Sequence, residues 1–115
     1  MAQQIMRRTG RIQEIIAPLE QQIVSSGMSC ERVDAFGDVF GGVTVWVLVY
    51  EKYFMRASNR ATLTLTLIES GGVITANVMA SGGGSAAIHR FSWGVEESFA
   101  QDGWNALAAV GFTQP

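Results

Sequence analysis

Apolar residues recur at helical spacing over the first part of the chain. They are Ile5, Ile12, Ile16, Leu19 and Ile23. When Thr9 is counted between the first two, neighbouring positions are alternately four and three residues apart, which puts them on one face of a helix. The pattern predicts an N-terminal helix that ends before Gly27. Pro18 removes one backbone hydrogen bond, so we expect one kinked helix; the alternative is a helix that restarts with Pro18 in its first turn.

From Glu31 the pattern changes to the alternation of β-strands. The pattern over Val33–Phe40 predicts a short, irregular strand that ends at a Gly41-Gly42 turn. The pattern over Val43–Phe54 predicts the clearest strand of the chain. Because strand side chains alternate between faces, four valines share one face and Thr44, Trp46, Leu48 and Tyr50 share the other. Both faces are largely apolar, whereas a sheet covered on one side only carries a polar face toward water.

Two further strands follow the turn-like residues 56–60. Ala61–Glu69 alternates between leucine and threonine, Ser70-Gly71-Gly72 predicts a hairpin, and Val73–Ala80 predicts the returning strand. The glycine-rich segment 81–85 ends this meander.

The last third of the sequence is helical in pattern. Ser92 is a suitable N-cap, and Glu96 and Glu97 fall in the first turns, where carboxylates favour the positive end of the helix dipole. Gly103 is expected to interrupt this helix and Gly111 to end it. We therefore predict one α+β domain over residues 1–115, with two layers: an N-terminal helix, a three- to four-stranded antiparallel meander and a C-terminal helix.

Composition and charge narrow the functional classes. The net charge is −2 and basic residues are scattered, which disfavours a nucleic-acid partner. Cys30 is the single cysteine, so no internal disulfide or thiolate metal site is expected, and a reducing cytoplasm fits best. No signal peptide or transmembrane stretch is recognisable, so no membrane partner is expected.

Basic and aromatic residues gather around the connection between the two best strands. Lys52, Tyr53, Arg56, Asn59 and Arg60 lie within nine positions of one another. Guanidinium groups bind carboxylates and phosphates, so this cluster is a candidate site for a small anion. Trp93, at the predicted helix start, is a further candidate lining residue. The alternative is ordinary solubilising charge at a strand end.

No catalytic, metal or cofactor motif stands out. The triple glycine 82–84 lacks the phosphate-binding fingerprints, and His89 has no nucleophile at diagnostic spacing. Adjacent glutamates diverge on a helix, and nothing near Cys30 in the sequence lowers its pKa. Structural roles explain these residues more simply, so we assign no catalytic residue, no metal and no cofactor.

Several short blocks resemble a small bacterial family of uncharacterised proteins, a domain of unknown function. These blocks are Val49-Tyr50-Glu51-Lys52-Tyr53, Asn59-Arg60-Ala61, Ser81-Gly82-Gly83-Gly84 and the run from Phe91 to Phe99. The resemblance implies a bacterial cytoplasmic origin and directs attention to the 52–60 loop and the 92–97 helix start. It implies no mechanism.

The apolar character of both strand faces leads to the functional hypotheses. Two helices can cover one face, so the other is expected to be buried by self-association, as a homodimer formed through Trp46, Leu48 and Tyr50. The chain would then be a non-enzymatic binding or scaffolding module. The alternative is a binding protein for a small anionic or apolar ligand. An enzyme, third, requires His89, Glu96 and the lysine cluster to share one cleft.

Overall fold

The computed structural model describes residues 5–55, 58–82 and 86–115, with side chains from residue 94 onward in the last range. Its elements are, in chain order, β1 (Met6–Thr9), α1 (Ile12–Val24), β2 (Glu31–Phe40), β3 (Val43–Phe54), β4 (Asn59–Ser70), β5 (Val73–Gly82) and α2 (Ala86–Ala109). The fold is α+β as predicted. The sheet has five strands, however, where three or four were expected. No helix in the described ranges is long and apolar enough to cross a membrane.

The strands form one antiparallel sheet in the order β1-β5-β4-β3-β2. The segment 33–40 is therefore an edge strand, paired with β3 through a register shift between Arg32 and Asp34. Two-residue turns, Gly41-Gly42 and Gly71-Gly72, close the hairpins β2–β3 and β4–β5. All four glycines have positive φ angles, between 56° and 91°. Two-residue hairpin turns require such angles, and residues with a side chain rarely adopt them.

The fifth strand, β1, replaces the first turns of the predicted N-terminal helix. Ile5 and Thr9 fit a helical stripe in sequence, but Met6–Thr9 pairs instead with the free edge of β5. Burial of Met6 on the helix side of the sheet favours this extended conformation. Gly10, at φ 129°, separates the strand from the helix that follows. Long-range pairing has overridden local periodicity here.

Helix α1 begins at Ile12 and runs through Pro18 to Val24. The expectation of one helix is confirmed, and the alternative restart at Pro18 is wrong. Two carboxylates satisfy N–H groups at its start: Glu14 accepts from the N–H of Arg11 at 3.1 Å, and Glu69 of β4 accepts from that of Ile12 at 2.9 Å. Negative charge at this end also favours the helix dipole.

Helix α2 begins six residues before the predicted start at Ser92 and continues through Gly103. The expected interruption at Gly103 is wrong for a packing reason. A Cβ at this position would lie 3.1 Å from Val78 Cγ1 and 3.2 Å from Leu63 Cδ1, so glycine lets the helix approach the sheet closely. The predicted end holds, because Gly111 follows the helix at φ 98°.

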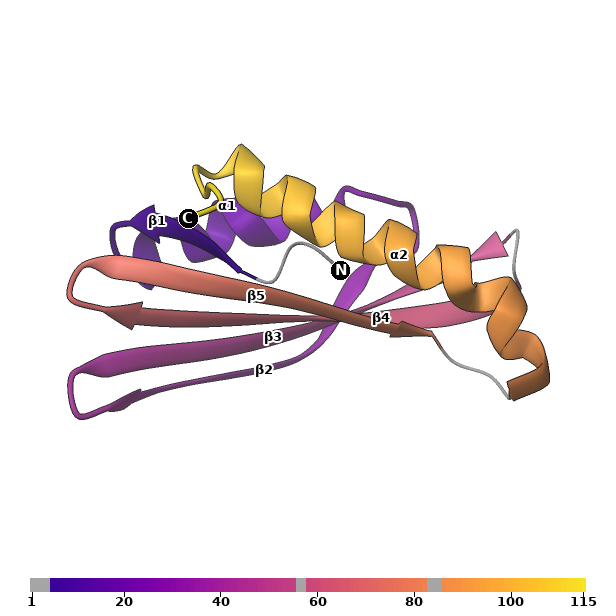
Figure 1. Ribbon diagram of the computed structural model, residues 1–115, viewed down its shortest axis with the longest axis horizontal. Helices are drawn as coiled ribbons and strands as arrows, with labels where there is room; N and C mark the ends of the chain where they lie inside the picture. The colour runs from indigo at the N-terminus through magenta and orange to yellow at the C-terminus, as the bar shows by residue number, and fades with distance from the viewer. Residues whose placement is uncertain (1–4, 56–57, 83–85) are drawn as a thin grey trace.

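Both helices lie over the same face of the sheet, as Figure 1 shows. That face supplies the core, in which Leu48, Tyr50, Ala61, Leu63, Leu65, Leu67, Ile74, Ala76 and Val78 of the sheet meet Ile12, Ile15, Leu19 and Ile23 of α1 and Val95, Phe99, Ala106 and Leu107 of α2. On the opposite side of β2–β5 no described element covers the sheet (Figure 1). The predicted two layers are present, and one face of the sheet remains open.

Candidate functional site

The sheet face turned away from the helices, called the open face below, is mainly apolar over its β2–β3 half, with two aspartates at the β2 edge. Strand register places its residues unambiguously, because directly paired residues in an antiparallel sheet share a face. It comprises Asp34, Phe36, Asp38 and Phe40 of β2; Val43, Val45, Val47 and Val49 of β3; Thr62, Thr64, Thr66 and Ile68 of β4; and Val73, Thr75, Asn77 and Met79 of β5. The alternation predicted for the valines and threonines is confirmed.

Large apolar side chains on the open face are exposed to solvent. Phe36 and Phe40 are each 55% exposed, Ile68 is 41% exposed and Met79 is 61% exposed. The valines of β3 lie between them and are half-buried. Exposed apolar side chains gathered on one face mark an interaction surface more often than isolated ones do.

The β2 edge of the open face is acidic, and carboxylates occupy two of its backbone donors. Carboxylate oxygens of Asp34 and Asp38 accept from the N–H groups of Ala35 and Val39, at 2.8 and 2.7 Å. In a hairpin with a two-residue turn, the N–H groups of alternate residues, these two included, point to the unpaired edge. Charged groups bound along an edge oppose strand addition. The β2 edge is therefore protected against pairing with another strand.

The opposite edge, formed by β1, is basic. Arg7 pairs with Thr75, projects on the open-face side and donates from Nε to Thr75 Oγ1 at 3.2 Å. Within the described residues it forms no ion pair. Backbone hydrogen bonds of 2.8 and 2.9 Å between Arg7 and Thr113 cover the edge of this strand.

The ligand cluster predicted from the sequence is divided between the two faces. Lys52 pairs with Ala61 and points toward the helices, while Tyr53 pairs with Arg60 and both point away from them. The side chain of Lys52 is only 12% exposed, whereas that of Arg60 is 58% exposed. The sheet itself therefore separates the lysine from the arginine.

Lys52 is held in the protein interior by partners from α2 and from the segment that follows α1. Its Nζ lies 2.9 Å from an oxygen of Asp102 in α2 and donates to the carbonyl of Ser26, after α1, at 3.1 Å. The ammonium also lies 5.0 Å from the ring centroid of Phe54 and 5.6 Å from that of Phe99. These contacts join α1, β3 and α2, which is a structural role.

The remaining members of the predicted cluster are spread around the far end of the β3–β4 hairpin. Arg60 pairs with Glu51 at 3.1 Å and lies over the ring of Tyr53 at 5.8 Å. Asn59 accepts from the backbone N–H of Arg60 at 2.9 Å. Arg56 lies outside the described residues, and so does the side chain of Trp93. Among the described members of this cluster, Arg60 forms a surface ion pair with Glu51, and their side chains do not converge on a common binding site.

Cys30 lies beside Lys52 and is buried. Burial raises the pKa of its thiol, although the Ser26 side chain and the Lys52 charge act in the opposite direction. The thiol therefore stays protonated at neutral pH, the form that is not nucleophilic. This environment favours the structural role that we expected.

The groups considered for catalysis are engaged elsewhere or lie outside the described residues. Glu96 accepts from the backbone N–H of Gly82 at 2.6 Å and thereby joins α2 to the end of β5. The side chain of His89 and the glycines 83–84 lie outside the described part. Lys52 is paired with Asp102, so it and Glu96 each have a structural contact.

The residues predicted to mediate self-association point toward the helices. Leu48 and Tyr50 are 0% exposed, and Trp46 packs against the core. The Tyr50 hydroxyl lies 3.4 Å from Glu20 of α1, which is paired with Arg32. Burial and the Glu20 charge raise the pKa of Tyr50 well above its usual range. Leu48 and Tyr50 are therefore enclosed between the sheet and the helices, whereas the valine face of β3 is covered by no described element.

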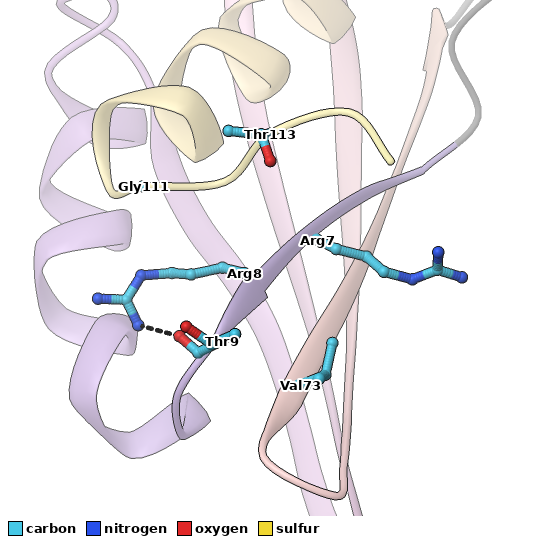
Figure 2. A pocket seen from close by; sticks show the side chains of 6 residues that line it. All are labelled: Arg7, Arg8, Thr9, Val73, Gly111 and Thr113. Carbon is cyan, nitrogen blue, oxygen red and sulfur yellow. Dashed lines mark hydrogen bonds between the residues drawn. The ribbon is translucent and has the colours of Figure 1, made fainter.

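A cleft of about 550 Å³ lies where β1 meets the C-terminal segment (Figure 2). Arg7, Arg8, Thr9, Val73, Gly111 and Thr113 line it. Arg7 and Arg8 point to opposite sides of β1, and Arg8 donates to the carbonyl of Thr9 at 3.0 Å (Figure 2). The cleft offers guanidinium groups on separate sides of a strand, and sequence reasoning did not find it.

Sequence reasoning also missed the charged edges of the open face. Arg7 lies in a segment predicted as helix, so its place beside Thr75 required knowledge of β1. Asp38 alternates with Phe36 and Phe40, a signal that it shares their face, but only sheet order puts it and Arg7 on opposite edges.

A family model described as a family of unknown function (DUF6054) matches residues 1–111. No curated protein and no solved structure matches the chain. The resemblance to a domain of unknown function is thus confirmed.

Proposed function

We propose that this chain, which belongs to the DUF6054 family, is a non-enzymatic module that self-associates through its open face into a homodimer. The observation that carries the proposal is the row of exposed apolar side chains on a sheet face that no described element covers. Burying such a face removes apolar surface from water, which is the main driving force of association. A sheet-on-sheet contact is the natural form, because two sheet faces interdigitate at about 10 Å separation.

The size of the face suits a dimer. Strands β2 and β5 each have 10 residues, so β2–β5 present a footprint of roughly 33 by 19 Å, about 600 Å². Stable interfaces bury about 800 Å² per partner, so this face with its rim is close to sufficient. The protected β2 edge favours face-to-face contact over strand addition.

The test is the solution mass, measured by size-exclusion chromatography with light scattering over a dilution series. We expect a dimer for the wild type and a monomer for Val45→Lys, which places an ammonium in the apolar row. Val39→Lys is the matched control, because Val39 is 60% exposed on the opposite side of the same hairpin. A monomeric wild type, or equal dissociation of both variants, contradicts the proposal.

A second candidate function is binding of a small anionic ligand, and the observation that favours it is the Arg8 guanidinium in the cleft lined by β1. Within the described part of the chain, Arg8 donates one hydrogen bond, to a backbone carbonyl, which leaves further donors for an anion. Thermal-shift measurements with inorganic phosphate and citrate test this. Stabilisation lost in Arg8→Gln and kept in Arg60→Gln supports the cleft, whereas the reverse supports the loop predicted from the sequence.

The cellular setting is part of the proposal too. Placement in a bacterial cytoplasm is supported by the single, buried cysteine, which needs no oxidising compartment. Detection of the native protein in the soluble cytosolic fraction is the measurement that checks it.

A further inference from the structure

We infer that the two copies stack with a twofold axis along β4, so that Asp38 of each copy lies against Arg7 of the other. This arrangement rests on the proposed self-association and specifies its geometry. It follows from the register of the sheet and from the charges at its two edges.

One row of paired residues crosses all five strands of the open face. Asp38 of β2 pairs with Val45 of β3, Val45 with Ile68 of β4, Ile68 with Thr75 of β5, and Thr75 with Arg7 of β1. The row thus begins with a carboxylate, passes through two apolar residues and a threonine, and ends with a guanidinium. Ile68 occupies its centre.

A twofold rotation about an axis along β4 generates the second copy with the direction of this row reversed, so that the row of one copy lies over the row of the other. Ile68 then meets Ile68 of the second copy, and Asp38 meets Arg7 at both ends. Packed sheets cross at about 30°, which displaces the edge partners by roughly 5 Å along the strands. An arginine side chain spans that distance, so both ion pairs remain within reach.

The edge charges favour this arrangement over a second face-to-face dimer, in which the twofold axis runs across the strands. With the axis across the strands, β2 lies antiparallel over β2 of the second copy, so the two acidic edges that carry Asp34 and Asp38 face each other. Like charges opposed across an interface disfavour that complex, whereas complementary charges at the rims favour one register. Arg7, which forms no ion pair within the described residues, gains a carboxylate partner in the first arrangement.

Charge reversal tests the geometry. Asp38→Arg and Arg7→Glu each place like charges together, so each is expected to raise the dimer dissociation constant about tenfold or more. The double variant exchanges the two charges and is expected to return to within about threefold of the wild type. Glu97→Arg, an equal charge change on the exposed surface of α2, is the control and is expected to have no effect. Sedimentation equilibrium measures all five constants.

Cross-linking gives a second readout that does not depend on affinity. Asp38→Cys and Arg7→Cys proteins are mixed and treated with a short bis-maleimide, with each protein alone and the wild type, whose only thiol is buried, as controls. Cross-links in the mixture alone support the axis along β4. Cross-links of Asp38→Cys with itself, or no rescue by the double charge reversal, overturn this geometry while a dimeric wild type still upholds the proposed function. A monomeric wild type overturns both.

Discussion

The indole of Trp46 occupies the space that a side chain at Gly37 would fill. The two residues face each other across the β2–β3 pair, and a Cβ built at Gly37 would collide with the indole ring atoms of Trp46. An aromatic ring over a glycine in an edge strand covers backbone that would otherwise be exposed. Trp46 therefore packs within its own sheet, on the side that faces the helices.

Substitution of Gly37 by alanine is expected to destabilise the protein by about 1–2 kcal/mol, because the indole must leave its position. In a Trp46→Leu background the same substitution is expected to cost less than about 0.5 kcal/mol, since the space is then free. Urea denaturation of the four proteins measures the difference. Equal costs in both backgrounds would show that the indole does not exclude a side chain at this position.

The buried hydroxyl of Tyr50 predicts a loss of stability at alkaline pH. Because the pKa is raised in the folded state, both states keep the proton below about pH 10, and this contribution to stability is then complete. Above that pH the unfolded chain releases the proton and the folded protein retains it. The free energy of unfolding therefore falls by up to about 1.4 kcal/mol per pH unit from this residue.

Tyr50→Phe removes this titration, so its stability relative to the wild type is expected to rise between pH 9 and pH 11. At neutral pH it loses a hydrogen bond and is expected to be less stable by about 0.5–1.5 kcal/mol. Tyr53→Phe, at the exposed second tyrosine, is the matched control. A constant difference between Tyr50→Phe and the wild type across this range would refute the pH dependence.

The close approach at Gly103 predicts a dependence on side-chain size. Alanine gains about 1 kcal/mol of helix propensity and loses a similar amount to crowding against Val78 and Leu63, so we expect a change below about 1 kcal/mol. Gly103→Ile adds bulk that these neighbours cannot accommodate, and is expected to cost about 3 kcal/mol. Ala108→Ile, at an exposed position of the same helix, controls for propensity. Similar melting temperatures for the two isoleucine variants would contradict the packing explanation.

Local patterns predicted the parts of the fold whose signals are themselves local. Alternation over Val43–Phe54 gave the strand and the membership of each face, since side-chain direction in a strand follows from sequence alone. The Gly41-Gly42 turn predicted the hairpin for the same reason. Met6–Thr9 was assigned wrongly because its conformation depends on the free edge of β5, some seventy residues away.

The candidate site was less predictable, because it depends on register and sheet order. Lys52 and Arg60 are close in sequence, yet pairing of Lys52 with Ala61 and of Tyr53 with Arg60 puts the two charges on opposite faces. Which apolar face of β3 remains open depends on where the helices dock, and periodicity within β3 carries no information about that.

The ion pair of Lys52 and Asp102 is expected to contribute to stability, because it is partly shielded from water. Its side chains are 12% and 23% exposed, against 58% and 31% for the pair of Arg60 and Glu51. Asp102→Ala removes the carboxylate and leaves the ammonium with neutral partners, the Ser26 oxygens and two aromatic rings, so we expect a loss of about 2 kcal/mol.

A double-mutant cycle with Lys52→Met isolates the pair, since methionine keeps much of the apolar stem that packs near Phe54 and Phe99. We expect a coupling energy of about 1–2 kcal/mol, obtained from urea denaturation of the four proteins. The same cycle on Arg60→Met and Glu51→Ala is the exposed control, with an expected coupling below about 0.5 kcal/mol. Equal coupling in the two cycles would mean that burial adds nothing to the inner pair, and Lys52 would lose its assigned role in joining α2 to the sheet.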